Sequence, residues 1–281
     1  MGLLLRSCCG ARVVFDIHES WEESMAARAP RVLRPVARAA FKAALLSIAR
    51  RCDWVTVVSP INYCLYRSIR YDGHVDFIHN SPPPELFPPC SHNVAGPVTI
   101  CHEGMLSAQR GLVQLLEALA LARQEVDVRL LLLGRVRPYD LSLYHQKVDA
   151  LRLAEAIDFP GWIEYHKLGA ALSRGQIGLV AMQPTPNNYQ SLSNKIYNYM
   201  CCGQATIVPR GSATADLIRE VKAGLVVDTT NPAEIAVAVV RLVRDRVLRR
   251  RLGDNGRRAI LDRLGWHQME KKLYDIYARL A

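Results

Sequence analysis

The sequence predicts an α/β protein with parallel sheets, and three features support this prediction. From residue 98 onward, short apolar runs suited to strands alternate with amphipathic helical patterns. Glycines mark the ends of predicted elements: Gly134 follows a strand pattern and Gly203 follows a helical one. The chain has 281 residues, of which 50% are hydrophobic, which is enough for two modest domains with real cores. Such alternation implies parallel sheets with helices on both faces.

The second part of the chain carries the more regular pattern. A helix is expected to begin at about Asn194 after a polar loop. Another should begin after Asn231, where Asn231 can cap, Pro232 can take the first helical position and Glu234 can close a capping box. Strands are expected at residues 98–101, 128–133, 157–159, 177–180, 205–208 and 224–227, and helices at 111–124, 141–153 and 266–280.

The first part is shorter. Strands are expected at residues 13–17, 54–58 and 75–79, with a long helix at 32–51. Pro82-Pro-Pro84 and the polar stretch 90–97 resemble a linker, so a boundary is expected there. The predicted domains are therefore residues 1–93 and 94–264, followed by a terminal helix at 265–281.

Composition limits the class of partner without choosing one. Lys and Arg number 36 and Asp and Glu 26, so the net charge of +10 favours nucleic acid, acidic lipid or a phosphorylated substrate. The eight cysteines form no CxxC pair, so no metal site is expected. No apolar run has the length of a membrane span, and no signal-peptide pattern begins the chain, so a cytoplasmic location is expected.

Two segments could bind an anion. The first turn of the helix at Asn194 has unpaired N–H groups, and it lies where ligands bind in α/β sheets. Gly104, after the strand at 98–101, would let the backbone approach a ligand, and Arg110 could clamp a phosphate through its two-pronged guanidinium. A lone loop arginine is commonly only solvated, and Lys195 could equally form a structural ion pair.

Six segments in order resemble known sequences. They are VFDIHE (residues 14–19), DWVTVVS (53–59), FIHN (77–80), ELF (85–87), GMLSAQRG (104–111) and the stretch 189–208. Together they resemble retaining GT-B glycosyltransferases of family 4, the glycosyl transferases group 1. The resemblance implies a GT-B-like fold with a complete C-terminal Rossmann-like donor domain and a partial N-terminal Rossmann-like domain. It also implies that the last helix crosses back to the first domain.

The resemblance assigns roles to several residues of the stretch 189–208. Gln190 and Asn198 occupy the two positions, eight apart, where the family typically has Glu. The first such Glu lies near the donor sugar and the second accepts hydrogen bonds from the ribose. An amide oxygen at position 198 can still accept, although a carboxylate bonds more strongly, at roughly 1.5–3 against about 1 kcal/mol. Backbone N–H groups of Ser191 and Leu192 would reach a phosphate.

Other assignments complete the implied donor site. Asn194 and Lys195 match the family pattern, and Gly104 and Arg110 match its diphosphate loop. His18 matches a histidine that touches the donor sugar near the acceptor. The structural alternative for His18 is a loop histidine satisfied by Asp16 or Glu19.

The function implied is retaining transfer of a sugar from a nucleotide-diphosphate donor to a glycan or lipid-linked acceptor of the cell envelope. No metal and no other cofactor is required, because positioning and stabilisation of the leaving diphosphate suffice. Two alternatives remain: a non-catalytic or degenerate GT-B protein that needs a partner chain, and a nucleotide-sugar epimerase. The lost carboxylates favour the first alternative, whereas the motifs follow family 4 and disfavour the second.

The first domain raises two further expectations. In the family, the VFDIHE strand normally comes late in the acceptor domain, whereas here it begins near residue 13. Three explanations are open: a mis-assigned start codon, a companion chain or dimer that covers the sheet, or a degenerate protein. In the helix at 31–51, Arg31, Arg34, Arg38 and Lys42 recur at three- and four-residue steps among apolar residues. Such a helix suits binding to the anionic inner face of a membrane. The alternative is an ordinary helix that covers the sheet of the first domain. Nucleic acid is not expected, because no aromatic stacking pattern accompanies the basic residues.

Overall fold

The computed structural model describes residues 2–18, 20–69 and 74–281, and they form two compact units. Unit 1 contains residues 1–80, 185–192 and 267–281, and unit 2 contains residues 81–184 and 193–266. Residues 81–93, which the sequence analysis assigned to the first domain, thus lie in unit 2. Segment 185–192 belongs to unit 1 although it interrupts unit 2 in the sequence.

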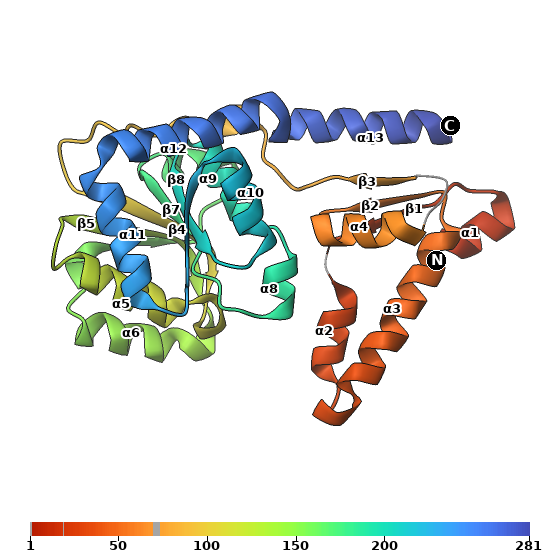
Figure 1. Ribbon diagram of the computed structural model, residues 1–281, viewed down its shortest axis with the longest axis horizontal. Coiled ribbons are helices and arrows are strands. Elements are labelled where there is room, and N and C mark those ends of the chain that lie inside the picture. Colours follow the sequence, from red (N-terminus) through yellow and green to blue (C-terminus); the bar gives the residue numbers. More distant parts are fainter. Residues whose placement is uncertain (1, 19, 70–73) are drawn as a thin grey trace. The chain divides into compact units, whose positions relative to one another are not determined.

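Unit 2 is built on a six-stranded parallel sheet with the strand order β6-β5-β4-β7-β8-β9 (Figure 1). Its strands are β4 (Val98–Leu106), β5 (Val128–Val136), β6 (Ile157–Gly161), β7 (Ile177–Leu179), β8 (Ala205–Pro209) and β9 (Gly224–Val227). Both β4 and β5 extend beyond their predicted ends, because Gly104 and Gly134 lie opposite each other within the paired strands instead of ending them. A Cβ on Gly134 would lie 2.0 Å from the carbonyl oxygen of Gly104, so only glycine fits there.

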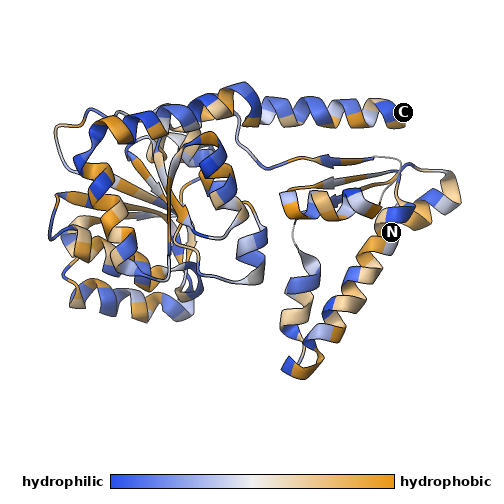
Figure 2. Cartoon of the chain, in the orientation of Figure 1, coloured by the Kyte–Doolittle hydropathy of each residue, from blue (hydrophilic) through white to orange (hydrophobic). Residues whose placement is uncertain are grey.

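Helices cover both faces of this sheet. On one face, α5 packs against α6 and α11; on the other, α9 packs against α7 and α12. Figure 2 shows the apolar strands enclosed by helices whose outward residues are hydrophilic. The bounds are α5 (Leu112–Ala122), α6 (Leu141–Ala150), α7 (Tyr165–Leu172), α9 (Asn194–Cys201), α10 (Ala213–Val221), α11 (Pro232–Arg244), α12 (Arg246–Ala259) and a π-helical turn at Ile260–Leu264.

Several helix ends follow the predicted chemistry. Helix α9 begins at Asn194 as predicted, and Gly203 adopts a positive φ of 67° just after it. Asn231 caps α11 by accepting a hydrogen bond from the backbone N–H of Ala233 at 3.0 Å. The capping-box role predicted for Glu234 was wrong, because its carboxylate pairs with Arg210 instead.

Unit 1 contains a three-stranded parallel sheet with the order β1-β2-β3. Its strands are β1 (Val14–Ile17), β2 (Trp54–Val57) and β3 (Val75–Phe77), and its helices are α1 (Gly2–Cys9), α2 (Trp21–Arg28), α3 (Arg34–Arg51), α4 (Pro60–Ile69), α8 (Pro186–Gln190) and α13 (Trp266–Leu280). Met269 and Ile276, on α13, are buried. No helix among the described residues is long and apolar enough to cross a membrane.

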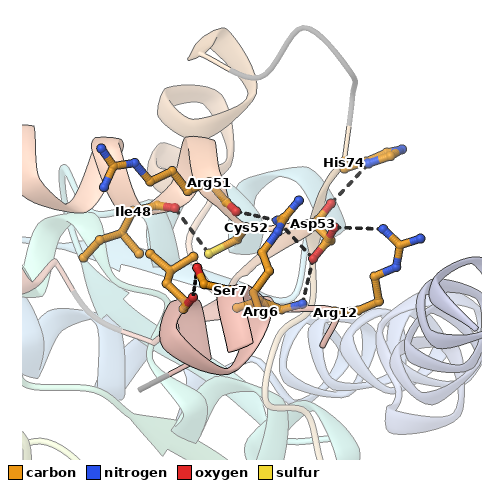
Figure 3. Close-up of polar contacts among 10 residues, drawn as sticks. Arg6, Ser7, Arg12, Ile48, Arg51, Cys52, Asp53 and His74 are labelled. Carbon is orange, nitrogen blue, oxygen red and sulfur yellow. Dashed lines mark hydrogen bonds and ion pairs between the residues drawn. The ribbon is translucent and has the colours of Figure 1, made fainter. Parts of the chain in front are cut away.

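Asp53 anchors the start of the unit 1 sheet (Figure 3). Its carboxylate accepts the backbone N–H of Val13 at 2.8 Å and lies 3.2 Å from Arg6 and 3.3 Å from Arg12. Burial raises the pKa of Asp53, but the Val13 hydrogen bond and the two arginines outweigh it, so the pKa is lower than usual. The aspartate of the DWVTVVS motif is therefore a structural residue that joins β1 to β2.

Candidate functional site

The start of α9 places three polar residues against the end of β4 in unit 2. Five residues of this short helix, Ile196, Tyr197, Tyr199, Met200 and Cys201, are buried. They hold the helix against the sheet, so its remaining side chains take defined positions. Asn194 is exposed at the first position, while Lys195 and Asn198 are partly buried three residues apart on a shared face. The loop before the helix is held by the backbone N–H of Ser193, which donates to Thr214 Oγ1 at 3.1 Å.

Glu103 lies opposite this helix and was missed by the sequence analysis. Its side chain is 5% exposed on β4, and its Oε1 accepts a hydrogen bond from Asn198 Nδ2 at 2.8 Å. Its backbone N–H donates to the hydroxyl of Tyr199 at 3.1 Å. We call Glu103, Lys195 and Asn198 the carboxylate cluster. The signal available in the sequence was a charged residue within an apolar strand pattern, directly before Gly104.

The charges of this cluster influence one another. Burial raises the pKa of Glu103 to about 7, although Lys195 and the Asn198 hydrogen bond pull it down. Burial also lowers the pKa of Lys195, which the Glu103 charge raises and the Arg110 charge lowers. Arg110, at the end of the turn Ala108–Arg110, is therefore close enough to Lys195 for the two cations to repel each other.

A cavity of about 300 Å³ opens beside the cluster. Its polar lining residues are Glu103, Asn194 and Lys195, next to Gly104. The other lining residues are Leu133, Gly134, Trp162, Ile163, Tyr165 and Leu168. Residues Trp162 and Tyr165 are 59% and 52% exposed. The Arg135 guanidinium lies 5.6 Å from the centre of the Trp162 ring, and Phe87 packs edge-on to Tyr165, so the rings are only partly covered. This combination of a cation, a carboxylate and aromatic rings suits a ligand with a negative group and a planar ring.

Gly104 controls how closely a ligand approaches Lys195. It adopts a positive φ of 88°, and a Cβ at this position would lie 2.9 Å from Lys195 Nζ. The absent side chain therefore leaves room for the ammonium group of Lys195. Gly104, Arg110, Asn194, Lys195 and Asn198 thus all belong to unit 2.

The other predicted site residues belong to unit 1. Nε2 of His18 lies 2.7 Å from Oδ2 of Asp16, and Nδ1 lies 3.3 Å from Nδ2 of Asn80. The contact with Asp16 is the structural alternative anticipated for this histidine, whose side chain is 51% exposed. Glu19, which follows it in the same motif, lies outside the described residues.

Gln190, Ser191 and Leu192 also lie in unit 1. Gln190 Oε1 accepts from Ser20 Oγ at 3.0 Å, and its backbone carbonyl accepts from Ser59 Oγ at 2.6 Å. The N–H of Ser191, expected to reach a phosphate, donates instead to the carbonyl of Asn187 at 3.1 Å. This expectation is corrected because the end of α8 uses that donor. Leu192 is partly buried.

Comparison with known families matches residues 97–245 to the glycosyl transferases group 1. The match covers more than half of the chain and includes all of β4 through α11. Two curated relatives are an uncharacterized glycosyltransferase of Methanocaldococcus jannaschii and an MMP alpha-(1->4)-mannosyltransferase of Mycolicibacterium hassiacum. The first is 21% identical over 66% of this chain and 46% of the relative, and the second 22% over 60% and 40%. The chain thus spans less than half the length of either curated relative.

Solved structures share the fold. Sucrose-phosphate synthase of Thermosynechococcus elongatus matches with a TM-score of 0.78, at 21% identity over 99% of this chain and 70% of that one. HepE of Anabaena, in complex with UDP and glucose, matches with a TM-score of 0.74, at 15% identity over 99% and 74%. WaaG, a glycosyltransferase of lipopolysaccharide biosynthesis, matches with a TM-score of 0.68, at 13% over 97% and 80%. These likenesses confirm the predicted α/β, GT-B-like fold.

Proposed function

The chain belongs to the glycosyl transferases group 1 family, and we propose that it moves a hexose from a nucleotide-diphosphate sugar to a glycan or lipid-linked acceptor. The names of similar proteins support a sugar-transfer role, since they include a mannosyltransferase and an enzyme crystallised with UDP-glucose. The transfer is proposed to retain the anomeric configuration and to proceed without a metal. Neither of the alternatives, a non-catalytic remnant or an epimerase, is favoured by these relatives.

The cavity beside α9 is the observation that carries the proposal. Lys195 brings a positive charge to its lining, next to Gly104. A diphosphate placed there would also meet the first-turn N–H groups of α9 at Asn194. Trp162 and Tyr165, which also line the cavity, offer aromatic surface to a nucleobase. The cavity therefore matches the three parts of a nucleotide-sugar donor that differ most in chemistry: anion, ring and polar sugar.

The same cations would serve the chemical step. When the bond between the anomeric carbon and the diphosphate oxygen breaks, negative charge collects on the leaving oxygen. Lys195, which lines the cavity, can stabilise that charge directly, and we propose that Arg110, whose charge acts on Lys195, assists it although it does not line the cavity. The role of His18 at the sugar, in unit 1, remains a prediction.

Isothermal titration calorimetry with UDP, GDP, UDP-glucose and GDP-mannose tests the donor site. We expect at least one of these to bind with micromolar affinity. Folded protein that binds none of them would refute the proposal. Mass spectrometry of reactions with lipid-linked and free glycan acceptors then tests transfer. Binding without transfer would indicate the non-catalytic alternative, and an altered free sugar would indicate the epimerase. The anomeric proton coupling of the product distinguishes retention from inversion.

We further propose that the protein docks peripherally on an anionic membrane surface through α3 and the turn before it. Val32 and Val36 are 88% and 68% exposed in this region, close in sequence to the exposed Arg31. Exposed apolar side chains flanked by cations suit the interface of an acidic bilayer. The structure also supports the alternative, because Arg34 and Arg38 have partners inside unit 1: the carbonyls of Ala27 and Ala29, and the carboxylate of Glu23.

A further inference from the structure

Glu103 is a buried carboxylate with one oxygen unused. Oε1 accepts the hydrogen bond from Asn198, while Oε2 is buried and has no hydrogen-bond partner within the part of the chain that the structure describes. Leaving a buried acceptor unpaired is costly, and more so for a charged one. Such a cost is tolerated where the group has a function to perform on a ligand.

The unused oxygen belongs to a residue that lines the cavity. Glu103 and Lys195 contribute polar groups to its lining, and Trp162 and Tyr165 contribute aromatic rings to the same lining. In its ionised form this carboxylate accepts hydrogen bonds and repels a phosphate, because both carry negative charge. It therefore selects the part of a ligand that carries hydroxyl donors.

Asn198 determines which oxygen is free. Its side-chain NH₂ donates to Oε1 and so holds the carboxylate in one orientation. One N–H of the Asn198 amide is thereby used within the protein, while its Oδ1 can still accept a hydrogen bond. Asn198 is thus a positioning residue for Glu103, and strand β4 adds a carboxylate acceptor for a ligand hydroxyl beside this amide.

We propose that Glu103 accepts hydrogen bonds from the ribose hydroxyls of the donor nucleotide and makes the site specific for ribonucleotides. The proposal rests on the proposed function, because it requires a nucleotide in this cavity. A vicinal diol can donate both of its hydroxyls to one carboxylate. A site built to accept from a hydroxyl discriminates strongly against an analogue that lacks it, since the buried acceptor is then left unpaired.

The test compares UDP or GDP, whichever the wild-type protein binds more tightly, with its 2′-deoxy and 3′-deoxy analogues. We expect wild-type protein to bind the ribonucleotide about tenfold or more tightly than at least one analogue. In Glu103→Gln, the glutamine can still accept from Asn198 but places an NH₂ or a weaker acceptor at the second position. We expect this variant to lose about tenfold in affinity for the ribonucleotide and to bind all three ligands alike.

Glu125→Gln is the matched control, because it removes a carboxylate three residues before β5 begins at Val128, whereas Glu103 pairs with Leu133 farther along that strand. It should bind as the wild type does. Equal binding of ribonucleotide and deoxy analogues by wild-type protein would overturn the assignment, even if Glu103→Gln failed to fold. A Glu103→Gln variant that keeps the discrimination would overturn it as well. If wild-type protein bound no nucleotide at all, the proposed function itself would fail.

Discussion

The carboxylate of Glu103 and the side-chain amide of Asn198 form a hydrogen bond of 2.8 Å between strand β4 and helix α9. The two residues are 95 positions apart in sequence. The resemblance to family 4 enzymes calls for a carboxylate at position 198, and here the neighbouring strand presents one to the same space. The loss of the glutamate from the helix therefore does not by itself indicate a degenerate site.

This pairing predicts that restoring the family residue alone will harm the site. Asn198→Glu places a second carboxylate within hydrogen-bond distance of Glu103, and the two charges repel in a buried setting. We expect nucleotide affinity to fall at least tenfold in this variant. The double variant Glu103→Gln/Asn198→Glu exchanges the two side-chain types, so its affinity should return to within a few-fold of wild type. Calorimetry measures the nucleotide affinity of both variants. Tighter binding by Asn198→Glu than by wild type would contradict the role given to the Glu103–Asn198 pair.

A second prediction concerns pH. Because the folded-state pKa of Glu103 is raised from 4.5 to about 7, the folded protein holds this proton more tightly than the unfolded chain. The resulting stabilisation is complete below about pH 4.5 and is lost as the pH rises to about 7. Two other titratable groups interact with this carboxyl: burial lowers the pKa of Lys195, and burial together with the Glu103 charge raises the pKa of Tyr199 well above its usual value.

Urea unfolding of wild type and Glu103→Gln at pH 5 to 8 checks this directly. Glutamine has no such proton, so the variant should gain in stability relative to wild type as the pH rises across this range. A difference in the free energy of unfolding between the two proteins that stays constant from pH 5 to 8 would contradict the raised pKa of Glu103. The preference of wild-type protein for ribonucleotide over deoxy analogues should increase over the same range. The ionised carboxylate only accepts hydrogen bonds, whereas the protonated form carries an O–H donor on one of its oxygens.

The cations of the site are expected to act on the diphosphate and not on the base. Lys195→Met removes the buried ammonium while keeping an aliphatic chain, and Arg110→Ala removes the second cation. Each should weaken UDP or GDP binding by about tenfold or more and leave binding of uridine or guanosine unchanged. Arg244→Ala is the control, because Arg244 pairs with Glu125 at 3.0 Å near the amino ends of the strands. A uniform loss for nucleoside and nucleotide would argue against the assignment.

Gly104 offers a test of the close approach at Lys195. Gly104→Ala introduces a Cβ 2.9 Å from Lys195 Nζ at a positive φ. We expect it to cost roughly 1–3 kcal/mol of stability from backbone strain and also to weaken nucleotide binding. Gly211→Ala separates the two effects, because Gly211 also has a positive φ of 75° but no atom within 4 Å of the added Cβ. It should lose comparable stability without any change in affinity. Loss of binding in both variants would point to strain alone.

Local pattern predicted much of the fold and only part of the site. The start of α9 at Asn194 and the cap at Asn231 follow from neighbouring residues, so the sequence revealed them. Glu103 was missed because a single charge within an apolar run reads as part of the strand, and its partner is 95 residues away. The attachment of segment 185–192 to unit 1 depends on bonds from Ser20 and Ser59 to Gln190, across 170 and 131 residues. No periodicity encodes such distant contacts.

The proposed membrane surface needs a variant chosen from the structure and not from the charge pattern alone. Arg34 and Arg38 hold the α2–α3 pair together, so reversing their charge would disturb folding as well as docking. Arg31→Glu/Lys42→Glu reverses two exposed cations and keeps those contacts. We expect flotation with vesicles of 30% phosphatidylserine to recover wild-type protein and several-fold less of the variant, since each basic residue near an anionic surface contributes roughly 1 kcal/mol. Arg219→Glu/Lys222→Glu reverses two cations at the end of α10 in unit 2 and should float like wild type. Equal recovery of the α3 variant and wild type would leave α3 as an ordinary covering helix of unit 1.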